Sequence, residues 1–361
     1  MEGGGRKVPG GPMGIIKIPD SAKKEFAEHY PKILESGNLA EGEWNGALAS
    51  LVKNMTSANG SVCFNSNGSG LLAILLLLKR YRGYQNIFIQ ANTMYGVKTI
   101  AVTSGLKYLE PVECRLRSLM PDIGQLKNYI KKLDHPQKTV FLLTHIGGIV
   151  NPDILEIAEV CKQSGIALVE DCAHSFGATL HSRHTGLFGV AGVYSFYSTK
   201  AIPAGEGGVA VTHDKELAEQ LQRFNIYDRF EQKQDVGINF RQSEIQALFA
   251  FCVCKRSDEI IKNKDRIAEK YIEACQKLKI DFISPYQNGQ KGNNYKFTVL
   301  LPENNKIDLR KIKNKTSAVY DYALGNDPEN ISRRHLCLPI WYALEEEKIQ
   351  ATLSELECLR V

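Results

Sequence analysis

The hydrophobic positions of this chain follow two patterns that alternate along the sequence. One has apolar residues at the three-to-four-residue spacing of an amphipathic helix, and the other is a short continuous apolar run. We predict helices over residues 21–35, 45–55, 71–80, 97–103, 122–133, 152–164, 214–224, 243–253 and 256–278. We predict strands over residues 61–65, 86–91, 107–112, 139–144 and 166–170. This alternation predicts an α/β fold with a mostly parallel sheet flanked by helices.

The pattern also predicts how the chain divides. Residues 13–235 carry most of the alternating segments, so we expect a large domain there, and residues 236–361 are expected to form a smaller C-terminal α/β domain. Within the small domain we predict a strand over 295–301, a helix over 308–314, a strand over 335–338 and a helix from residue 344 onward. Residues 1–12 are rich in glycine and proline, and we expect a disordered tail. A chain of 361 residues is long enough for such a two-domain core.

One lysine, Lys200, stands between two apolar runs, 192–197 and 209–211. Gly205, Gly207 and Gly208 follow it, so the stretch is read as strand, turn, strand. Burial lowers the pKa of an amine, and a neutral amine is a nucleophile toward carbonyl groups and pyridoxal phosphate. The alternative is a solvent-exposed lysine in a loop, which is the usual place for this residue type. The residues upstream favour the first interpretation.

The predicted strand 166–170 is followed by Asp171 and then by His174. Ligands of open α/β sheets bind beyond the carboxyl ends of the strands, where these side chains are expected. A pyridoxal ring requires a carboxylate beside its ring nitrogen and a lysine that forms a Schiff base. Read alone, Asp171 is also a good helix N-cap and His174 a good core histidine. Together with Lys200 they predict a pyridoxal phosphate site.

A phosphate site is predicted where the strand 61–65 leads into the helix 71–80. Gly68, Ser69 and Gly70 stand at this junction. Glycines allow the backbone to approach a phosphate, and the free N–H groups and positive dipole at a helix start attract anions. The alternative is a glycine-rich turn with a serine cap and no ligand.

The motifs taken together resemble the DegT/DnrJ/EryC1/StrS family of pyridoxal-phosphate-dependent sugar-nucleotide aminotransferases. The resemblance runs from about residue 38 to the C-terminus, with the motifs in the family's order. The matching stretches are Asn67-Gly-Ser-Gly-Leu-Leu, Glu170-Asp-Cys-Ala-His-Ser-Phe-Gly-Ala, Ser195-Phe-Tyr-Ser-Thr-Lys200, Gly205-Glu-Gly-Gly, Gly237-Ile-Asn-Phe-Arg-Gln-Ser-Glu-Ile-Gln-Ala and Leu338-Pro-Ile-Trp. The resemblance implies the aspartate-aminotransferase-like fold, called fold type I, and the cofactor pyridoxal 5′-phosphate, which cycles with its pyridoxamine form.

The resemblance also implies roles for single residues. Lys200 would form the Schiff base and move the proton, and Asp171 would keep the ring nitrogen protonated. His174 would contact the ring oxygen or Asp171, and Ser195 the phosphate or the ring edge. Asn239 would reach the cofactor phosphate of the neighbouring subunit, which implies a homodimer with shared active sites. By its sequence context alone, Asn239 before a predicted helix is a cap or turn residue.

One position departs from the family pattern. The family has an aromatic residue directly after the threonine that follows the second strand, and that residue stacks on the pyridoxal ring. Here Thr93 is followed by Met94, with Tyr95 next. A thioether can cover an aromatic face, and a small backbone shift would present the tyrosine instead. The sequence leaves open which of the two side chains covers the ring.

The function implied by the resemblance is transfer of an amino group from an amino acid such as glutamate to a keto-sugar linked to a nucleoside diphosphate, in amino-sugar biosynthesis. The sugar, the ring carbon (C3 or C4) and the nucleotide stay open. A pyridoxamine-dependent dehydratase of the same family is disfavoured, because such members replace the lysine with histidine. Another fold type I enzyme acting on amino acids, or a non-enzymatic sensor or scaffold, remains an alternative. Candidates for binding the diphosphate are Arg241, Arg333, Arg334 and His335.

Composition argues against several other classes of function and partner. The net charge of +5 is spread along the chain, so no nucleic-acid partner is expected. Nine cysteines without Cys-x-x-Cys spacing favour reduced thiols in the cytoplasm and predict no metal site. The longest apolar run, 71–78, is too short to span a bilayer, and no signal-peptide pattern opens the chain. We therefore expect no membrane association.

Overall fold

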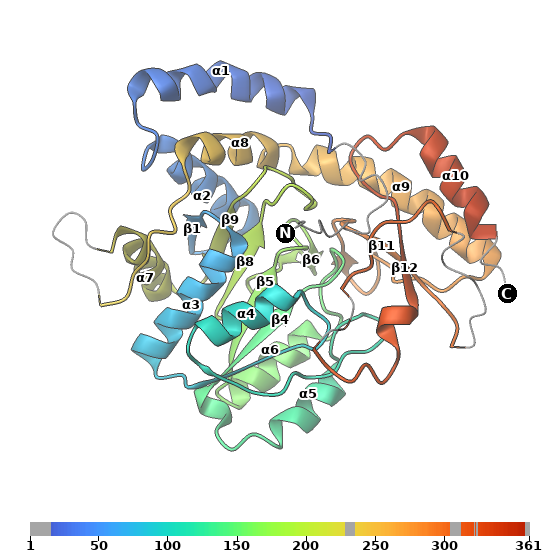
Figure 1. Cartoon of the computed structure of the whole chain (residues 1–361), viewed down its shortest axis with the longest axis horizontal. Helices are drawn as coiled ribbons and strands as arrows, with labels where there is room; N and C mark the ends of the chain where they lie inside the picture. Colours follow the sequence, from blue (N-terminus) through green and yellow to red (C-terminus); the bar gives the residue numbers. More distant parts are fainter. Residues whose placement is uncertain (1–15, 228–234, 304–311, 321, 323, 358–361) are drawn as a thin grey trace, which may run out of the picture.

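A computed structural model describes residues 16–227, 235–303, 312–320, 322 and 324–357. Its centre is a seven-stranded sheet in the order β1-β9-β8-β5-β4-β2-β3 (Figure 1). The strands are β1 (Gly60–Phe64), β2 (Asn86–Ile89), β3 (Lys107–Tyr108), β4 (Thr139–Thr144), β5 (Ala167–Cys172), β8 (Ala191–Ser195) and β9 (Gly208–Thr212). Within this sheet only β9 runs against the others, which confirms the predicted, mostly parallel arrangement.

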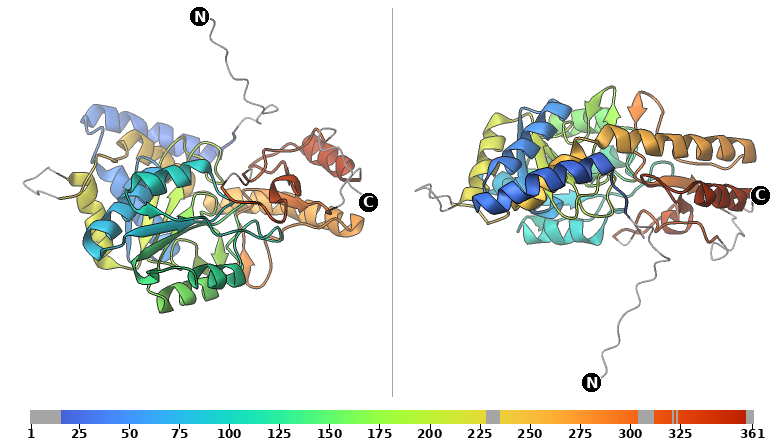
Figure 2. Two further views of the ribbon diagram at one scale, coloured as in Figure 1. Left: turned by 60° about the horizontal axis from the view of Figure 1, so that its bottom comes forward. Right: turned by 90° about the horizontal axis from the view of Figure 1, so that it is seen from above.

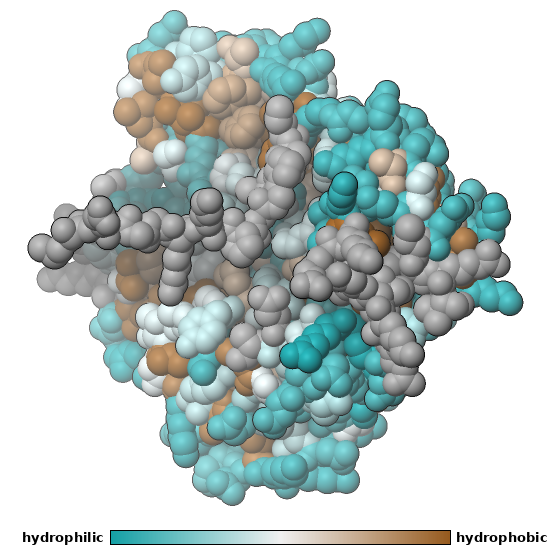
Figure 3. Space-filling view, turned by 45° about the vertical axis from the view of Figure 1, so that its right-hand side comes forward, coloured by the Kyte–Doolittle hydropathy of each residue, from teal (hydrophilic) through white to brown (hydrophobic). Residues whose placement is uncertain are grey.

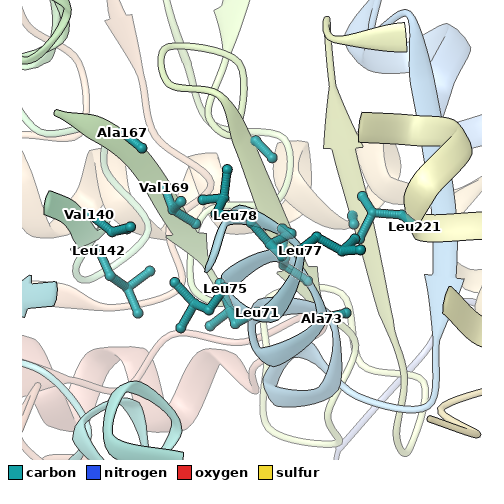
Figure 4. Close-up of a cluster of buried hydrophobic side chains, with 14 of the residues drawn as sticks. Leu71, Ala73, Leu75, Leu77, Leu78, Val140, Leu142, Ala167, Val169 and Leu221 are labelled. Carbon is teal, nitrogen blue, oxygen red and sulfur yellow. The ribbon is translucent and has the colours of Figure 1, made fainter. Parts of the chain in front are cut away.

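Helices cover both faces of the sheet. They are α1 (Asp20–Ser36), α2 (Glu43–Thr56), α3 (Asn67–Arg82), α4 (Tyr95–Thr103), α5 (Ile123–Ile130), α6 (Ile154–Gln163), α7 (Lys215–Ile226) and α8 (Glu244–Cys254). Side chains of β4 alternate between the two faces: Val140 and Leu142 pack with α3, whereas Phe141 and Leu143 pack on the side of α5 and α6. Figure 4 shows leucines of α3 on the same side of the sheet as Val140, Leu142 and Val169, while the helix itself packs on β8 and β9. The period of two along each strand thus separates two cores.

The C-terminal part has its own core. Strands β11 (Phe297–Leu300) and β12 (His335–Leu338) pair antiparallel and pack with α9 (Ser257–Leu278) and α10 (Glu346–Leu356). In the right-hand view of Figure 2, α9 and α10 lie together at the end of the molecule opposite α7. Because α8 packs against α1 and α2, the predicted small domain also contacts the large one. The division at residues 235 and 236 stays a prediction.

Short elements complete the described chain. Strands β6 (Thr179–Leu180), β7 (Arg183–His184) and β10 (Gln290–Lys291) form a small sheet, and 3₁₀ turns occur at Pro136–Lys138 and Ile331–Arg333. The predicted tail, 1–12, lies outside the described residues, as does most of the predicted helix 308–314. No helix in the described parts of the chain combines the length and the apolar character that a membrane span needs.

Among the predicted boundaries, two differ from the structure by four residues. Helix α3 begins at Asn67 rather than at residue 71, because the Ser66 side chain caps it by accepting a hydrogen bond from the Ser69 N–H. Strand β3 ends at Tyr108 rather than at residue 112, and the chain returns to the sheet only through a single bridge between Val112 and Gln90. The first difference places the glycine-rich stretch inside the first turn of α3.

Candidate active site

The Asp171 carboxylate is buried at the carboxyl end of β5. Its Oδ1 accepts hydrogen bonds from Asn67 Nδ2 (3.1 Å) and the Ala173 N–H (3.0 Å), while Oδ2 accepts one long bond from Thr144 Oγ1 (3.3 Å). Burial raises the pKa of Asp171, and these donors together with the charge of Lys200 oppose the rise. A carboxylate oxygen accepts about two hydrogen bonds, so Oδ2 has room for a further donor.

Lys200 lies in the connection between β8 and β9, as the sequence predicts. The side chain is half-buried, and its Nζ lies 5.5 Å from the centroid of the Tyr295 ring. Burial lowers the pKa of Lys200; the Asp171 carboxylate opposes this change, and the nearby Lys296 ammonium adds to it. The amine is therefore neutral over a wider pH range than an ordinary lysine.

His174 lies on the same side of the sheet and is buried. Its Nδ1 accepts the Gly147 N–H (3.4 Å), and its Nε2 lies 2.7 Å from the Tyr320 hydroxyl. Its ring is also 4.3 Å from that of Tyr295, measured between centroids. Burial lowers the pKa of His174 well below its usual value, and the nearby lysine charges add to this effect. The imidazole is therefore neutral at ordinary pH.

The predicted phosphate site is formed by the first turn of α3. Gly68 and Ser69 both lie in this turn, and Ser69 Oγ donates to Asn65 Oδ1 (2.6 Å). A Cβ on Gly208 would lie 2.6 Å from the Asn67 backbone nitrogen, so a glycine there allows β9 to approach the helix start. Ser195 is buried directly beside it, because it pairs with Gly208. The two serines and the helix start therefore share one edge of the sheet.

Three predicted residues are not joined to this group. Met94 and Tyr95 lie at the start of α4 with exposures of 47% and 61%. Asn239 is exposed, and its side chain accepts a hydrogen bond from the backbone N–H of Arg241 (3.3 Å). Within the described residues, no hydrogen bond or ring contact links these three to Asp171, Lys200 or His174.

The structure adds residues that sequence reasoning missed. Asn67 and Thr144 hold the Asp171 carboxylate, and Tyr295 and Tyr320 pack on His174 from the C-terminal part. Asn67 stands in a motif named above, and Thr144 is the last residue of the predicted strand 139–144. The sequence could therefore have suggested that both lie near the site. The two tyrosines follow no local pattern that points to a site.

Three of the candidates for diphosphate binding have contacts within the chain. His335 is buried, with its ring between the Ile331 carbonyl (2.6 Å) and the Val319 N–H (3.0 Å), so both ring nitrogens have partners within the chain. Arg241 pairs with Glu41 (3.0 Å). Arg334 Nε donates to the Leu301 carbonyl (3.2 Å). Each of these arginines therefore already has a partner within the chain.

A second group on β5 has the composition of a metal site. Nitrogen, oxygen and sulfur atoms of His145, Glu170 and Cys172 lie within 4.8 Å of one another. The Glu170 carboxylate accepts four hydrogen bonds, from the backbone N–H groups of Gly186, Phe188 and Gly189 and from His145. Burial raises the pKa of the Cys172 thiol well above its usual value, which favours the protonated form. Because four hydrogen bonds already use the lone pairs of the Glu170 carboxylate, these three residues fit a structural role better than metal binding.

The fold is that of solved aminotransferase structures. PseC of Helicobacter pylori, an aminotransferase involved in the biosynthesis of pseudoaminic acid, superposes with a TM-score of 0.82 at 19% identity, covering 96% of this chain and 97% of that one. A DegT DnrJ EryC1 StrS aminotransferase from Brucella abortus gives 0.82 at 19% identity, covering 94% and 96%. The predicted fold class is confirmed.

The chain belongs to the DegT/DnrJ/EryC1/StrS aminotransferase family, whose model matches residues 20–357. The UDP-4-amino-4,6-dideoxy-N-acetyl-beta-L-altrosamine transaminase of Helicobacter pylori is 23% identical over 69% of this chain and 66% of that protein. GDP-perosamine synthase of Escherichia coli O157:H7 is 32% identical over 33% of this chain and 34% of that protein. These matches span between about a third and two thirds of the relatives.

Proposed function

We propose that this protein is a pyridoxal-phosphate-dependent aminotransferase that moves an amino group from an amino acid to a keto-sugar linked to a nucleoside diphosphate. The observation that carries the proposal is the pair formed by Asp171 and Lys200. A buried carboxylate with one oxygen open to a further donor lies close enough to a half-buried amine for their charges to shift each other's pKa. An acid and an amine of this kind are what the cofactor requires.

The residues present fit pyridoxal phosphate. The open Oδ2 of Asp171 suits a protonated ring nitrogen, and the first turn of α3 with Ser69 suits the phosphate. Ser195 lies at the same edge and would hold the phosphate or the ring edge, and the buried His174 would contact the ring oxygen or Asp171. When bound, the cofactor supplies an electron sink for the carbanion formed at the amino-acid Cα.

The chain's own residues then move the proton. Burial lowers the pKa of Lys200, so the neutral amine is able to take a proton at Nζ. The charge of Asp171 raises the same pKa and so limits this effect. The Tyr295 ring packs beside Nζ and limits where the amine can lie. Asn67 and Thr144 hold the Asp171 carboxylate in one orientation, so its charge stays directed at one point.

The substrate class rests on the relatives. One is named a UDP-amino-sugar transaminase and another GDP-perosamine synthase, and both names describe amino sugars carried on nucleoside diphosphates. We extend this class to the present chain without choosing a sugar or nucleotide. The fold, which many chemistries share, supports the class less than the family does.

A homodimer with shared sites forms part of the same proposal. Four large apolar side chains close to predicted site residues are exposed, with fractions between 40% and 61%: Met94, Tyr95, Tyr197 and Ile238. Figure 3 shows that on one face of the molecule hydrophobic side chains gather at the upper left, while hydrophilic ones cover the lower edge and the right-hand side. Exposed apolar groups beside a site support a second subunit there. We also place the protein in the cytoplasm, because the eight described cysteines are buried and unpaired.

The function is tested by absorbance. The purified protein is converted to its pyridoxamine form with glutamate and then mixed with nucleotide-linked keto-sugars, one at a time. We expect at least one of them to restore the pyridoxal spectrum in a single turnover. If simple 2-oxo acids restore it and no keto-sugar does, the proposed substrate class is wrong.

The shared site is tested by mixing two variants, each of which should lose most or all of its activity when the cofactor is limiting. Lys200→Ala removes the amine of one site, and Asn239→Ala removes the proposed phosphate contact of the neighbouring site. A hydrogen bond to a charged group is worth roughly 1.5–3 kcal/mol, so Asn239→Ala should weaken cofactor binding by about one to two powers of ten. With random exchange about half of the dimers are mixed, and activity at limiting cofactor should reach roughly a quarter of wild type. Exchange shown by tagged pull-down without any gain in activity would exclude the shared site.

A further inference from the structure

A segment of the C-terminal part is anchored on both sides of Tyr320. Before it, Lys296 Nζ donates to Thr316 Oγ1 (3.1 Å) and to the Ser317 carbonyl (3.1 Å). The adjacent Val319 N–H donates to Nε2 of a buried histidine in β12 (3.0 Å). Lys296 directly precedes β11 and the histidine lies in β12, so the two-stranded sheet holds the backbone that leads into Tyr320.

The anchors after Tyr320 come from a different part of the chain. The Tyr322 hydroxyl donates to the Glu113 carboxylate, and the Glu329 carboxylate accepts the Leu116 N–H (2.6 Å). Both partners lie in the loop that follows β3. The segment is thus tied to the two-stranded sheet on one side of Tyr320 and to the loop after β3 on the other. Contacts on both sides therefore hold Tyr320 in place.

The contact that results is between Tyr320 and His174. The hydroxyl oxygen lies 2.7 Å from Nε2, and the two rings stack with centroids 5.2 Å apart and planes inclined by 20°. On the other side of the imidazole, the Gly147 N–H points at Nδ1 (3.4 Å). A backbone N–H can only donate, so Nδ1 carries no hydrogen. A neutral imidazole must then carry its hydrogen on Nε2 and donate it to the Tyr320 oxygen.

We propose that Tyr320 is a positioning residue of the active site, which accepts the Nε2 hydrogen of His174 and holds the plane of its ring. The Tyr320 oxygen accepts from His174, so its own O–H proton needs another acceptor, and no second partner occurs for it among the described residues. The kinetic effect of this arrangement rests on the proposed transaminase activity, whereas the histidine tautomer does not.

The tautomer is measured by nitrogen-15 NMR of protein labelled at its histidines, with the His174 signals assigned by their loss in His174→Gln. We expect the wild-type protein to show the neutral Nε2–H form from pH 6.5 to 8.5. Tyr320→Phe keeps the stacked ring but removes the acceptor of the Nε2 hydrogen, so the His174 signals should shift while the Gly147 N–H keeps the hydrogen on Nε2. Tyr286→Phe removes another buried hydroxyl, bonded to Asp265 (2.7 Å), and should leave the His174 signals unchanged.

Steady-state kinetics provides a second test of the role of Tyr320. Tyr320→Phe should lower kcat by about tenfold with little change in the KM of the amino-acid donor, and should cause no further loss in a His174→Phe background, because the tyrosine acts through the histidine. An Nδ1–H form in the wild-type protein, or unchanged His174 signals in Tyr320→Phe, overturns the proposal whether or not the enzyme transaminates. Equal kcat losses for Tyr320→Phe in both backgrounds would also overturn it. Shifted His174 signals in Tyr320→Phe, in a protein that aminates no keto-sugar, would instead count against the proposed function alone.

Discussion

The two faces of strand β5 bury neighbouring carboxylates in opposite ways. On one face, Glu170 accepts four short hydrogen bonds of 2.7–2.8 Å, three from backbone N–H groups and one from His145. On the other, Asp171 accepts three bonds of 3.0–3.3 Å, and its Oδ2 accepts only one of them. Both side chains are almost completely buried.

The difference teaches how to separate a structural carboxylate from a reactive one. A buried carboxylate whose acceptor positions are all filled fixes the chain around it, and here that chain is the loop 186–189. A buried carboxylate with an unfilled position and a cation nearby is prepared to bind another donor. Sequence alone gives the same Glu-Asp pair for both roles. The account predicts that a substitution of Asp171 lowers turnover, whereas a substitution of Glu170 lowers the free energy of unfolding.

The largest expected effect is on turnover in Asp171→Asn. An amide cannot hold a proton on the ring nitrogen as a carboxylate does, so kcat should fall by about 10²-fold or more. The free energy of unfolding of the cofactor-free protein should change by less than about 1 kcal/mol, because the amide still accepts from Asn67 and Ala173. Stopped-flow absorbance and urea unfolding measure the two quantities. A variant that keeps wild-type turnover would remove Asp171 from the proposed chemistry.

The converse loss is expected in Glu170→Ala. Three backbone N–H groups and the His145 ring lose their buried acceptor. Each buried donor left without an acceptor costs about 1–3 kcal/mol, so the free energy of unfolding should fall by about 3 kcal/mol or more. Urea unfolding of the cofactor-free protein should show this loss, with Glu159→Ala on the surface of α6 as the control. Unchanged stability would mean that the loop 186–189 does not depend on the carboxylate.

The same comparison shows what the sequence can predict. Lys200 and Asp171 were found because each follows a run of buried, β-forming residues, and that local pattern places it at the end of a strand. Tyr320 was not found, because its place depends on residues more than a hundred positions away: it contacts His174 directly, and the nearby Tyr322 bonds to Glu113. The start of α3 was misplaced because glycines weaken a helix pattern, while the Ser66 cap that overcomes this effect is a single polar residue.

A smaller effect is expected in the pH dependence of stability. The pKa of His174 is lowered in the folded protein, so between the usual value of about 6.5 and the lower folded value the unfolded chain binds more protons. Stability therefore falls with acid below about pH 6.5, by about 1.4 kcal/mol per pH unit from this residue. His174→Gln should lose that part of the slope in urea titrations at pH 7.5, 6.5 and 5.5. Parallel slopes for variant and wild type would show that His174 is not held neutral.

The most direct test of the account asks which lysine binds the cofactor. The purified protein with pyridoxal phosphate is reduced with borohydride, digested and mapped by mass spectrometry. The account predicts a phosphopyridoxyl group on Lys200, retained in Lys296→Met and absent in Lys200→Ala. Lys296 is a demanding control, because its Nζ lies 5.6 Å from the centroid of the same Tyr295 ring that neighbours Lys200. A label on Lys296 or on any other lysine, with Lys200 unmodified, would contradict the central claim.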